Sequence, residues 1–216
     1  MKTNIYNTYV FDFDGTLVDS MPYFGALMLR ILDENGICYP DDIIKTITPL
    51  GYGGTAKYFI EVLGVRSDTE TLVCRMLSLA KEDYEKRIPL KDGVRETLLA
   101  LKAKGASLNI LTASPHDVLD ICLKRLGVYD LFDNVWSCED FGTTKANPDI
   151  YREVAKRLSL PVSEYLFIDD NYNAVMTAKE AGTPAYGIYD TSGEEFADLL
   201  RKHADGYLMR LGDLLI

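Results

Sequence analysis

The stretch that decides the fold runs from residue 9 to residue 20 and reads YVFDFDGTLVDS. Its apolar and aromatic start predicts a strand that is packed on both faces. Two carboxylates, Asp12 and Asp14, stand two positions apart just before a Gly-Thr turn. Side chains at i and i+2 of a strand share a face, so the two acids converge if the extended backbone persists. If the strand breaks there, Asp12 lies at its tip and Asp14 lies in the loop that follows.

These two acids indicate a ligand site. Open parallel sheets bind ligands at the carboxyl ends of their strands, and this stretch marks such an end. Two neighbouring anions repel one another unless a cation or a shared proton lies between them. The simpler interpretation is a pair of solvated aspartates before a turn, and the remainder of the chain decides between the two.

The rest of the chain shows two kinds of pattern. Residues 20 to 88 carry apolar side chains at helical spacing with short connections, which predicts a small helical bundle. Within it, the glycine-rich segment Pro49–Gly54 predicts a loop. After residue 89, short apolar runs alternate with helical stripes, which predicts a parallel sheet with right-handed crossovers. We therefore expect an α/β protein with a Rossmann-like core formed by residues 1–19 and 89–216 and an inserted α-helical cap domain at residues 20–88.

Composition narrows the classes of partner. The 216 residues are 47% hydrophobic and 26% charged, which is ordinary for a globular protein. The net charge of −10 argues against non-specific binding to nucleic acid or to anionic membrane surfaces. The sequence shows no signal-peptide core, no apolar window of membrane-spanning length and no Cys-x-x-Cys pair. We expect a cytoplasmic protein with reduced thiols that binds neither nucleic acid nor membrane, and we make no prediction of its oligomeric state.

Three later segments add polar residues at the carboxyl ends of predicted strands. They are a hydroxyl-bearing group at Thr112, Ala113 and Ser114, a lysine at Lys145, and an acidic pair at Asp169 and Asp170. Each signal is weak when taken alone, because a threonine at a strand end, a lysine or an acidic turn is usually structural. Their order along the chain makes them informative together.

In this order the four segments resemble the four motifs of the haloacid dehalogenase superfamily, in its phosphatase form. The first stretch matches Asp-x-Asp-Gly-Thr-Leu-x-Asp-Ser at every specified position. Lys145, Pro148 and Asp149 match the third motif, although Ala146 stands where the family often has proline. A helical cap between the first and second motifs is also typical of this group, so the resemblance covers nearly the whole chain. Within the cap it is architectural only.

The resemblance implies a role for each motif residue. Asp12 is the expected nucleophile and Asp14 the expected general acid/base. The expected catalytic set is completed by Thr112 and Lys145, whose hydroxyl and ammonium groups would hold phosphate oxygens. The residues expected to bind the phosphate of the substrate are Gly15, Thr16, Ala113 and Ser114.

The same resemblance implies a Mg²⁺ site formed by Asp12, Asp14, Asp169 and Asp170. Asp170 is the expected direct ligand, Asp169 a second ligand or a ligand through water, and Asp14 a ligand through a nearby backbone carbonyl. Elementary electrostatics supports a cation, since two unit charges 4 Å apart at an effective dielectric of 20 repel by about 4 kcal/mol. Mg²⁺ prefers oxygen ligands and bridges carboxylate to phosphate. No cluster of His and Cys suits zinc.

The expected function is therefore Mg²⁺-dependent hydrolysis of a small phosphorylated metabolite, such as phosphoglycolate or a sugar phosphate, through an aspartyl-phosphate. The same motifs and a similar cap occur in β-phosphoglucomutase-like sugar phosphomutases, so this alternative stays open. A metabolite-binding protein without catalysis on the same scaffold is a third alternative, and the complete motifs argue against it. A dehalogenase or a phosphonatase is not expected, because those branches typically lack an acid at the position of Asp14.

Overall fold

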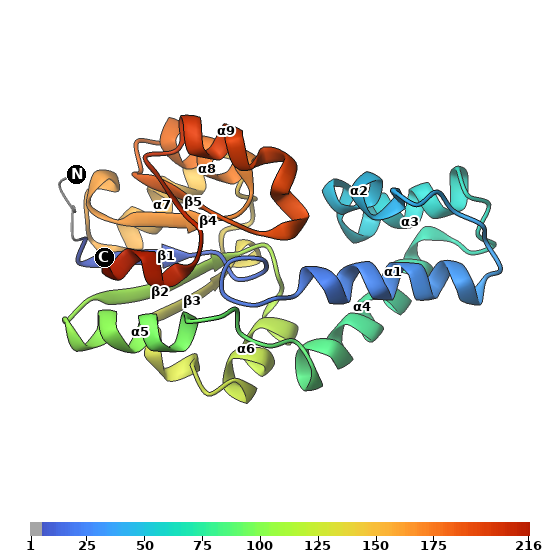
Figure 1. Ribbon diagram of the computed structural model, residues 1–216, viewed down its shortest axis with the longest axis horizontal. Helices are drawn as coiled ribbons and strands as arrows, with labels where there is room; N and C mark the ends of the chain where they lie inside the picture. The colour runs from blue at the N-terminus through green and yellow to red at the C-terminus, as the bar shows by residue number, and fades with distance from the viewer. Residues whose placement is uncertain (1–5) are drawn as a thin grey trace. The chain divides into compact units, whose positions relative to one another are not determined.

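The computed structural model describes residues 6–216 and forms two compact units (Figure 1). One unit contains the chain up to Asp19 together with Pro89–Ile216, and the other is Ser20–Ile88. The first is an α/β core and the second is helical. In the part of the chain that the structure describes, no helix is both long and apolar enough to span a membrane.

The core is built on one sheet of six strands in the order β3-β2-β1-β4-β5-β6. Every neighbouring pair of these strands is parallel, which confirms the predicted α/β class. The strands are β1 (Thr8–Phe11), β2 (Ser107–Thr112), β3 (Asn134–Ser137), β4 (Leu166–Asp169), β5 (Ala185–Ile188) and β6 (Gly206–Leu208). All four residues of β1 are buried, as expected for a strand covered on both faces. The chain builds outward from β1 in one direction and from β4 in the other, so the topology switches between these two strands.

Helices cover both faces of the sheet. Figure 1 shows α5 and α6 on one side and α8 and α9 on the other, as right-handed crossovers require. The core helices are α5 (Val94–Ala103), α6 (His116–Arg125), α7 (Asp149–Leu158), α8 (Tyr172–Glu180) and α9 (Ala197–His203). The core also contains short 3-10 segments, which are η2 (Tyr129–Leu131), η3 (Cys138–Phe141), η4 (Val162–Glu164), η5 (Thr191–Phe196) and η6 (Leu211–Leu215).

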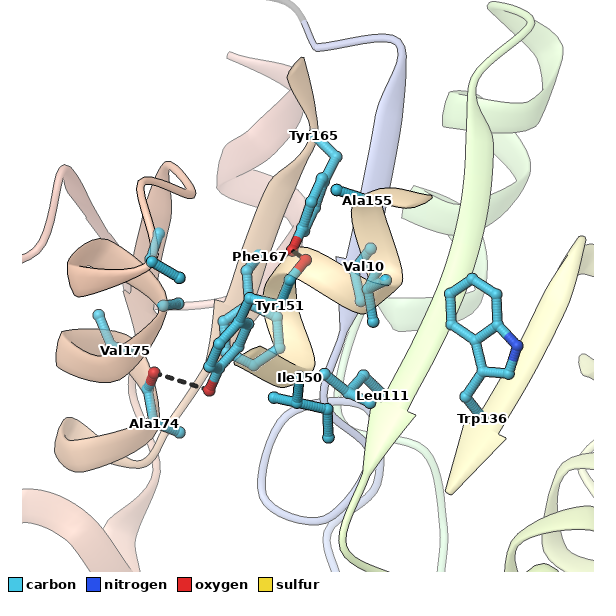
Figure 2. Close-up of a cluster of buried hydrophobic side chains, with 14 of the residues drawn as sticks. Val10, Leu111, Trp136, Ile150, Tyr151, Ala155, Tyr165, Phe167, Ala174 and Val175 are labelled. Carbon is cyan, nitrogen blue, oxygen red and sulfur yellow. Dashed lines mark hydrogen bonds between the residues drawn. The ribbon is translucent and has the colours of Figure 1, made fainter. Parts of the chain in front are cut away.

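A buried tyrosine links the hydrophobic core to the segment that carries Lys145. Tyr151 of α7 lies fully buried among side chains of β1, β2, β4 and α8 (Figure 2). Its hydroxyl lies 2.9 Å from the carbonyl oxygen of Ala174 and 3.0 Å from that of Lys145. The Tyr165 hydroxyl in turn donates to the Tyr151 carbonyl at 2.8 Å. Packing of α7 on the sheet therefore fixes the backbone from which Lys145 extends.

The helical unit corrects one prediction. Its elements are α1 (Met21–Glu34), α2 (Ile43–Ile47), η1 (Thr48–Leu50), α3 (Gly51–Glu61) and α4 (Thr69–Lys86). The predicted loop at Pro49–Gly54 was wrong, because η1 occupies its start and α3 begins at Gly51. Glycine weakens a helix by about 1 kcal/mol per residue relative to alanine. Burial of Ala56 and Phe59 outweighs that preference, since tertiary packing supplies most helix stability in proteins.

The core segment that precedes the helical unit pairs with the core segment that follows it. Val18 forms an antiparallel bridge with Leu90. The Asp19 amide donates to the Pro89 carbonyl at 3.0 Å. The chain therefore leaves the core and returns to it at adjacent positions.

Candidate active site

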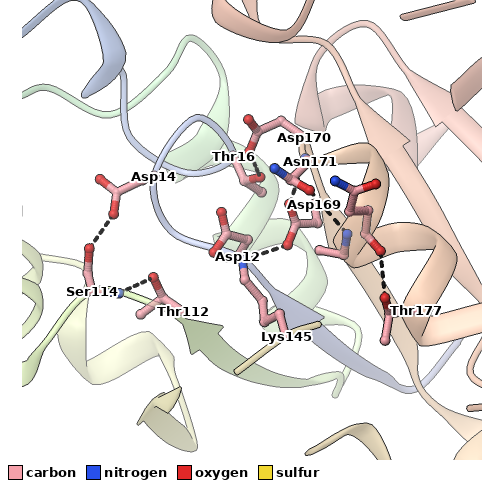
Figure 3. Close-up of polar contacts among 12 residues, drawn as sticks. Asp12, Asp14, Thr16, Thr112, Ser114, Lys145, Asp169, Asp170, Asn171 and Thr177 are labelled. Carbon is pink, nitrogen blue, oxygen red and sulfur yellow. Dashed lines mark hydrogen bonds and ion pairs between the residues drawn. The ribbon is translucent and has the colours of Figure 1, made fainter. Parts of the chain in front are cut away.

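The candidate site lies at the carboxyl edge of the sheet, around β1 and β4. This is the topological switch point, where open parallel sheets bind their ligands. Asp12 follows β1 directly, and its amide donates to the carbonyl of Ile168 in β4 at 2.9 Å. Asp169 is the last residue of β4. Figure 3 shows these two acids and Lys145 pointing toward one another.

Lys145 bridges two acids that come from different strands. Its Nζ lies 2.6 Å from Asp12 Oδ1 and 2.7 Å from Asp169 Oδ2. The lysine side chain is only 14% exposed. Burial acts to lower its pKa, but Asp12 and then Asp169 outweigh burial and hold the pKa of Lys145 well above its usual value. The lysine therefore stays charged in the site.

Three carboxylates surround this one ammonium. Oxygen atoms of Asp12, Asp169 and Asp170 all lie within 4.8 Å of one another. Burial raises the pKa of Asp12 to about 7, because desolvation outweighs the attraction of Lys145. Burial also raises the pKa of Asp170 well above its usual value, and the charges of Asp169 and Asp12 add to the effect. A group of acids in this state fits a hard divalent cation, which prefers carboxylate oxygens and favours their ionised form.

Asp170 is held by the turn after β1. Thr16 Oγ1 donates to Asp170 Oδ1 at 3.0 Å. Gly15 has a φ of +76°, and a Cβ at this position would lie 2.6 Å from Asp170 Oδ2. Only glycine fits both the backbone conformation and the approach of the carboxylate. Gly15 and Thr16 were expected to bind phosphate; the structure shows them against a candidate metal ligand, and their phosphate role stays a prediction.

Asp14 lies apart from this group of acids. The sequence left open whether Asp14 continues the strand or lies in the loop after it. In the structure β1 ends at Phe11, so Asp14 lies in the loop. Ser114 Oγ donates to Asp14 Oδ2 at 2.5 Å, and the Ser114 amide donates to Thr112 Oγ1 at 3.0 Å (Figure 3). The second motif thus contacts the expected general acid. Ala113 between them is exposed.

Two further residues of the site were missed by sequence reasoning. The Lys91 ammonium lies 2.6 Å from the Gly15 carbonyl oxygen, 2.7 Å from that of Tyr189 and 2.9 Å from Asp190 Oδ2. Asp190 is buried and contributes to the raised pKa of Asp170. Asp190 comes two residues after the end of β5, so its position near a strand end was a usable signal. Nothing in the sequence around Lys91 distinguishes it from a surface lysine.

His116 follows the second motif, Thr112–Ser114, and pairs with two aspartates. Its Nδ1 lies 3.0 Å from Asp120 Oδ1, and its Nε2 lies 2.9 Å from Asp140 Oδ2. Asp120 first, and then Asp140, raise the pKa of His116 above its ordinary value. The histidine therefore connects the start of α6 to η3.

Comparison with known proteins identifies the family. A family model described as haloacid dehalogenase-like hydrolase matches residues 6–182, a range that includes all four motifs. The chain belongs to this family. The predicted family and the prediction of an enzyme of the hydrolase class are thereby confirmed.

Two curated relatives of this haloacid dehalogenase-like hydrolase are a pyrophosphatase and a phosphatase by name. Pyrophosphatase PpaX of Bacillus velezensis is 30% identical over 95% of this chain and 93% of its own. Phosphoglycolate phosphatase of Yersinia pseudotuberculosis is 28% identical over 95% of this chain and 90% of its own. Among solved structures, a candidate β-phosphoglucomutase of Thermotoga maritima has a TM-score of 0.79 and 25% identity, with 97% of this chain and 96% of that chain covered.

Proposed function

We propose that the protein is a Mg²⁺-dependent phosphatase that hydrolyses a small phosphate monoester, of the phosphoglycolate or sugar phosphate type, through an aspartyl-phosphate. The observation that carries this proposal is the position of Lys145, which lies within 2.7 Å of both Asp12 and Asp169 at the switch point of the sheet. An ammonium beside a carboxylate offsets the repulsion that the carboxylate meets when it attacks an anionic ester. The name phosphoglycolate phosphatase of one relative supports a phosphate monoester as substrate. The name pyrophosphatase of another supports hydrolysis at phosphorus in general.

The proposed reaction has two steps. Asp12 attacks phosphorus as the bond to the ester oxygen breaks, and Asp14 gives its proton to that leaving oxygen. A water molecule then attacks the aspartyl-phosphate while Asp14 takes up a proton, which releases inorganic phosphate and restores Asp12. General acid/base assistance of this kind is typically worth about 10²–10⁴-fold. Lys145 remains beside Asp12 in both steps and neutralises charge on the phosphoryl oxygens.

We assign the proposed Mg²⁺ to Asp12 and Asp170, with Asp169 as the weaker ligand. Lys145 pairs with both Asp12 and Asp169, whereas Asp170 receives a hydroxyl bond from Thr16 and has a strongly raised pKa. Asp170 is therefore the acid whose ionised form gains most from a cation. When bound, Mg²⁺ would supply Lewis-acid stabilisation of the charge on the phosphoryl group.

The decisive experiment replaces Asp12 by asparagine. In the presence of Mg²⁺ and a panel of phosphorylated metabolites, Asp12→Asn should release no phosphate above background while keeping the circular dichroism spectrum of the folded protein. The matched control is Asp198→Asn, since the Asp198 side chain is 95% exposed and pairs with Arg201 of the same helix, α9. Turnover by Asp12→Asn close to that of Asp198→Asn would refute the mechanism.

A sugar phosphomutase remains the second candidate, because the Thermotoga maritima structure described as a candidate β-phosphoglucomutase aligns over nearly the whole chain. A mutase keeps the phosphoryl group on sugar, whereas a phosphatase loses it to water. Incubation with a hexose 1-phosphate separates the two, since only the phosphatase releases phosphate in step with loss of substrate.

A further inference from the structure

Ser114 occupies an unusual place between two expected catalytic residues. Its Oγ donates to Asp14 Oδ2 at 2.5 Å across 100 residues of sequence. Its own amide is fixed by Thr112 Oγ1 at 3.0 Å, directly after β2. The hydroxyl is therefore presented to Asp14 from the end of a sheet strand, whereas Asp14 itself lies in a loop.

This contact competes with the role that family resemblance gives to Ser114. A serine hydroxyl has one proton to donate. While that proton is directed to Asp14, it is not available to a phosphate oxygen. The geometry therefore connects Ser114 with the proton transfer and not with phosphate binding.

We propose that Ser114 is a positioning residue that holds the Asp14 carboxyl group in the orientation from which it protonates the leaving oxygen. The inference rests on the proposed phosphatase function and deepens it. Proton transfer requires the acid to lie within hydrogen-bond reach of the leaving oxygen, so an acid on a loop needs a fixed partner. Asp14 delivers its proton to the ester oxygen as the P–O bond breaks, and the resulting carboxylate keeps the Ser114 hydroxyl as donor.

The test exploits leaving groups that differ in their need for a proton. An alkyl oxygen must be protonated as it leaves, whereas a p-nitrophenolate leaves as a stable anion. The value of kcat/KM covers the steps from free enzyme and substrate through the first irreversible one, so the later hydrolysis of the aspartyl-phosphate does not contribute to it. The measured quantity is the ratio of kcat/KM for β-glycerol phosphate to kcat/KM for p-nitrophenyl phosphate.

Ser114→Ala should lower this ratio by about tenfold, the effect expected for loss of one hydrogen bond to a charged group. Ser114→Thr, which keeps the hydroxyl, should restore most of the ratio. The matched control is Tyr39→Phe, which should leave the ratio unchanged, because the Tyr39 hydroxyl also donates to a carboxylate, that of Asp33 at 3.0 Å, on the exposed surface of the helical unit. The double variant Asp14→Asn/Ser114→Ala should have the same ratio as the single variant Asp14→Asn.

Equal losses on both substrates would show that Ser114 binds phosphate or supports the fold, and would overturn the proposal. An unchanged ratio, or a Ser114→Ala effect that persists in the Asp14→Asn background, would overturn it as well. None of these results affects the proposed function, which depends on inactivity of Asp12→Asn toward both substrates.

Discussion

The Lys91 ammonium lies 2.6 Å from the carbonyl oxygen of Gly15, although 76 residues separate the two in the sequence. The same ammonium neutralises Asp190, whose side chain is only 3% exposed. Lys91 therefore ties the turn after β1 to the end of β5 and compensates a buried acid near Asp170. Its role follows from tertiary structure alone.

Replacement of Lys91 by methionine should destabilise the protein by about 3 kcal/mol, because it leaves the Asp190 carboxylate buried without its ion-pair partner. The measurement is the free energy of unfolding from urea titration. Lys156→Met provides the control, since Lys156 pairs with Glu153 at 74% exposure and such surface pairs contribute about 1 kcal/mol or less. Similar losses in the two variants would show that the Lys91 contacts carry no special weight.

Gly15→Ala should abolish most activity. The new Cβ would lie 2.6 Å from Asp170 Oδ2, and a displacement of about 1 Å at a catalytic group can cost roughly 100-fold in rate. Gly105→Ala is the matched control, because Gly105 has a similar φ of +81° with no heavy atom within 4 Å of the added Cβ. Both variants carry the left-handed strain of about 1–2 kcal/mol, so only the difference between them reports on Asp170. Equal phosphatase rates in the two variants would contradict the prediction.

Asp170→Asn should weaken Mg²⁺ binding more than Asp169→Asn does. We expect about a 100-fold rise in the Mg²⁺ dissociation constant for Asp170→Asn and about a tenfold rise for Asp169→Asn, within the range seen for residues around metal sites. The reason is that Asp169 already has a cationic partner, the Lys145 ammonium at 2.7 Å. Isothermal titration with Mg²⁺ alone measures the effect without turnover. The reverse order of affinities would exchange the roles of the two acids.

His116 should stabilise the fold more at acidic than at alkaline pH. Asp120 and Asp140 raise the pKa of His116, so the folded protein holds a proton that the unfolded chain releases near its ordinary value of 6.5. The stability from these ion pairs is fully present below that value and is lost as pH rises through the higher, folded pKa. The side chain is 40% exposed, so solvent screening limits the effect.

The measurement for His116 is the difference in unfolding free energy between the natural protein and His116→Gln. This difference should be larger at about pH 5.5 than at about pH 8.5, and by about 1 kcal/mol or less because the pairs are partly solvated. Comparison with the variant cancels the pH dependence that comes from the rest of the chain. A difference that is independent of pH would show that folding does not shift the pKa of His116, and would contradict the prediction.

The site residues that the sequence indicated share one property, which is their position after parallel strands. Asp12 follows β1 directly and Asp169 ends β4, so these two acids meet at one edge of the sheet. Lys145 comes after β3 and η3, and its ammonium lies 2.6 Å from Asp12 although 133 residues separate the two in the sequence. Asp170, next to Asp169, belongs to the same group of acids. Their catalytic and metal-binding roles stay predictions.

What the sequence could not provide depends on tertiary packing. Lys91 follows the helical unit, and its three acceptors come from Gly15, Tyr189 and Asp190. The helical state of Gly51–Gly54 depends on burial of residues later in α3, which outweighs local propensity. The bond from Ser114 to Asp14 depends on the path of the loop after β1. The spacing of two residues between Asp12 and Asp14 did not determine whether Asp14 continues the strand or lies in that loop.

The pairing of Asp19 with Pro89 has a practical consequence for engineering. The chain leaves the α/β unit at Asp19 and re-enters it at Pro89, and these residues are in contact. A linker of a few glycines between them would therefore give a continuous α/β unit without the helical insert. The helical insert would then become an exchangeable cassette, so inserts from other family members could be grafted onto an unchanged set of acids.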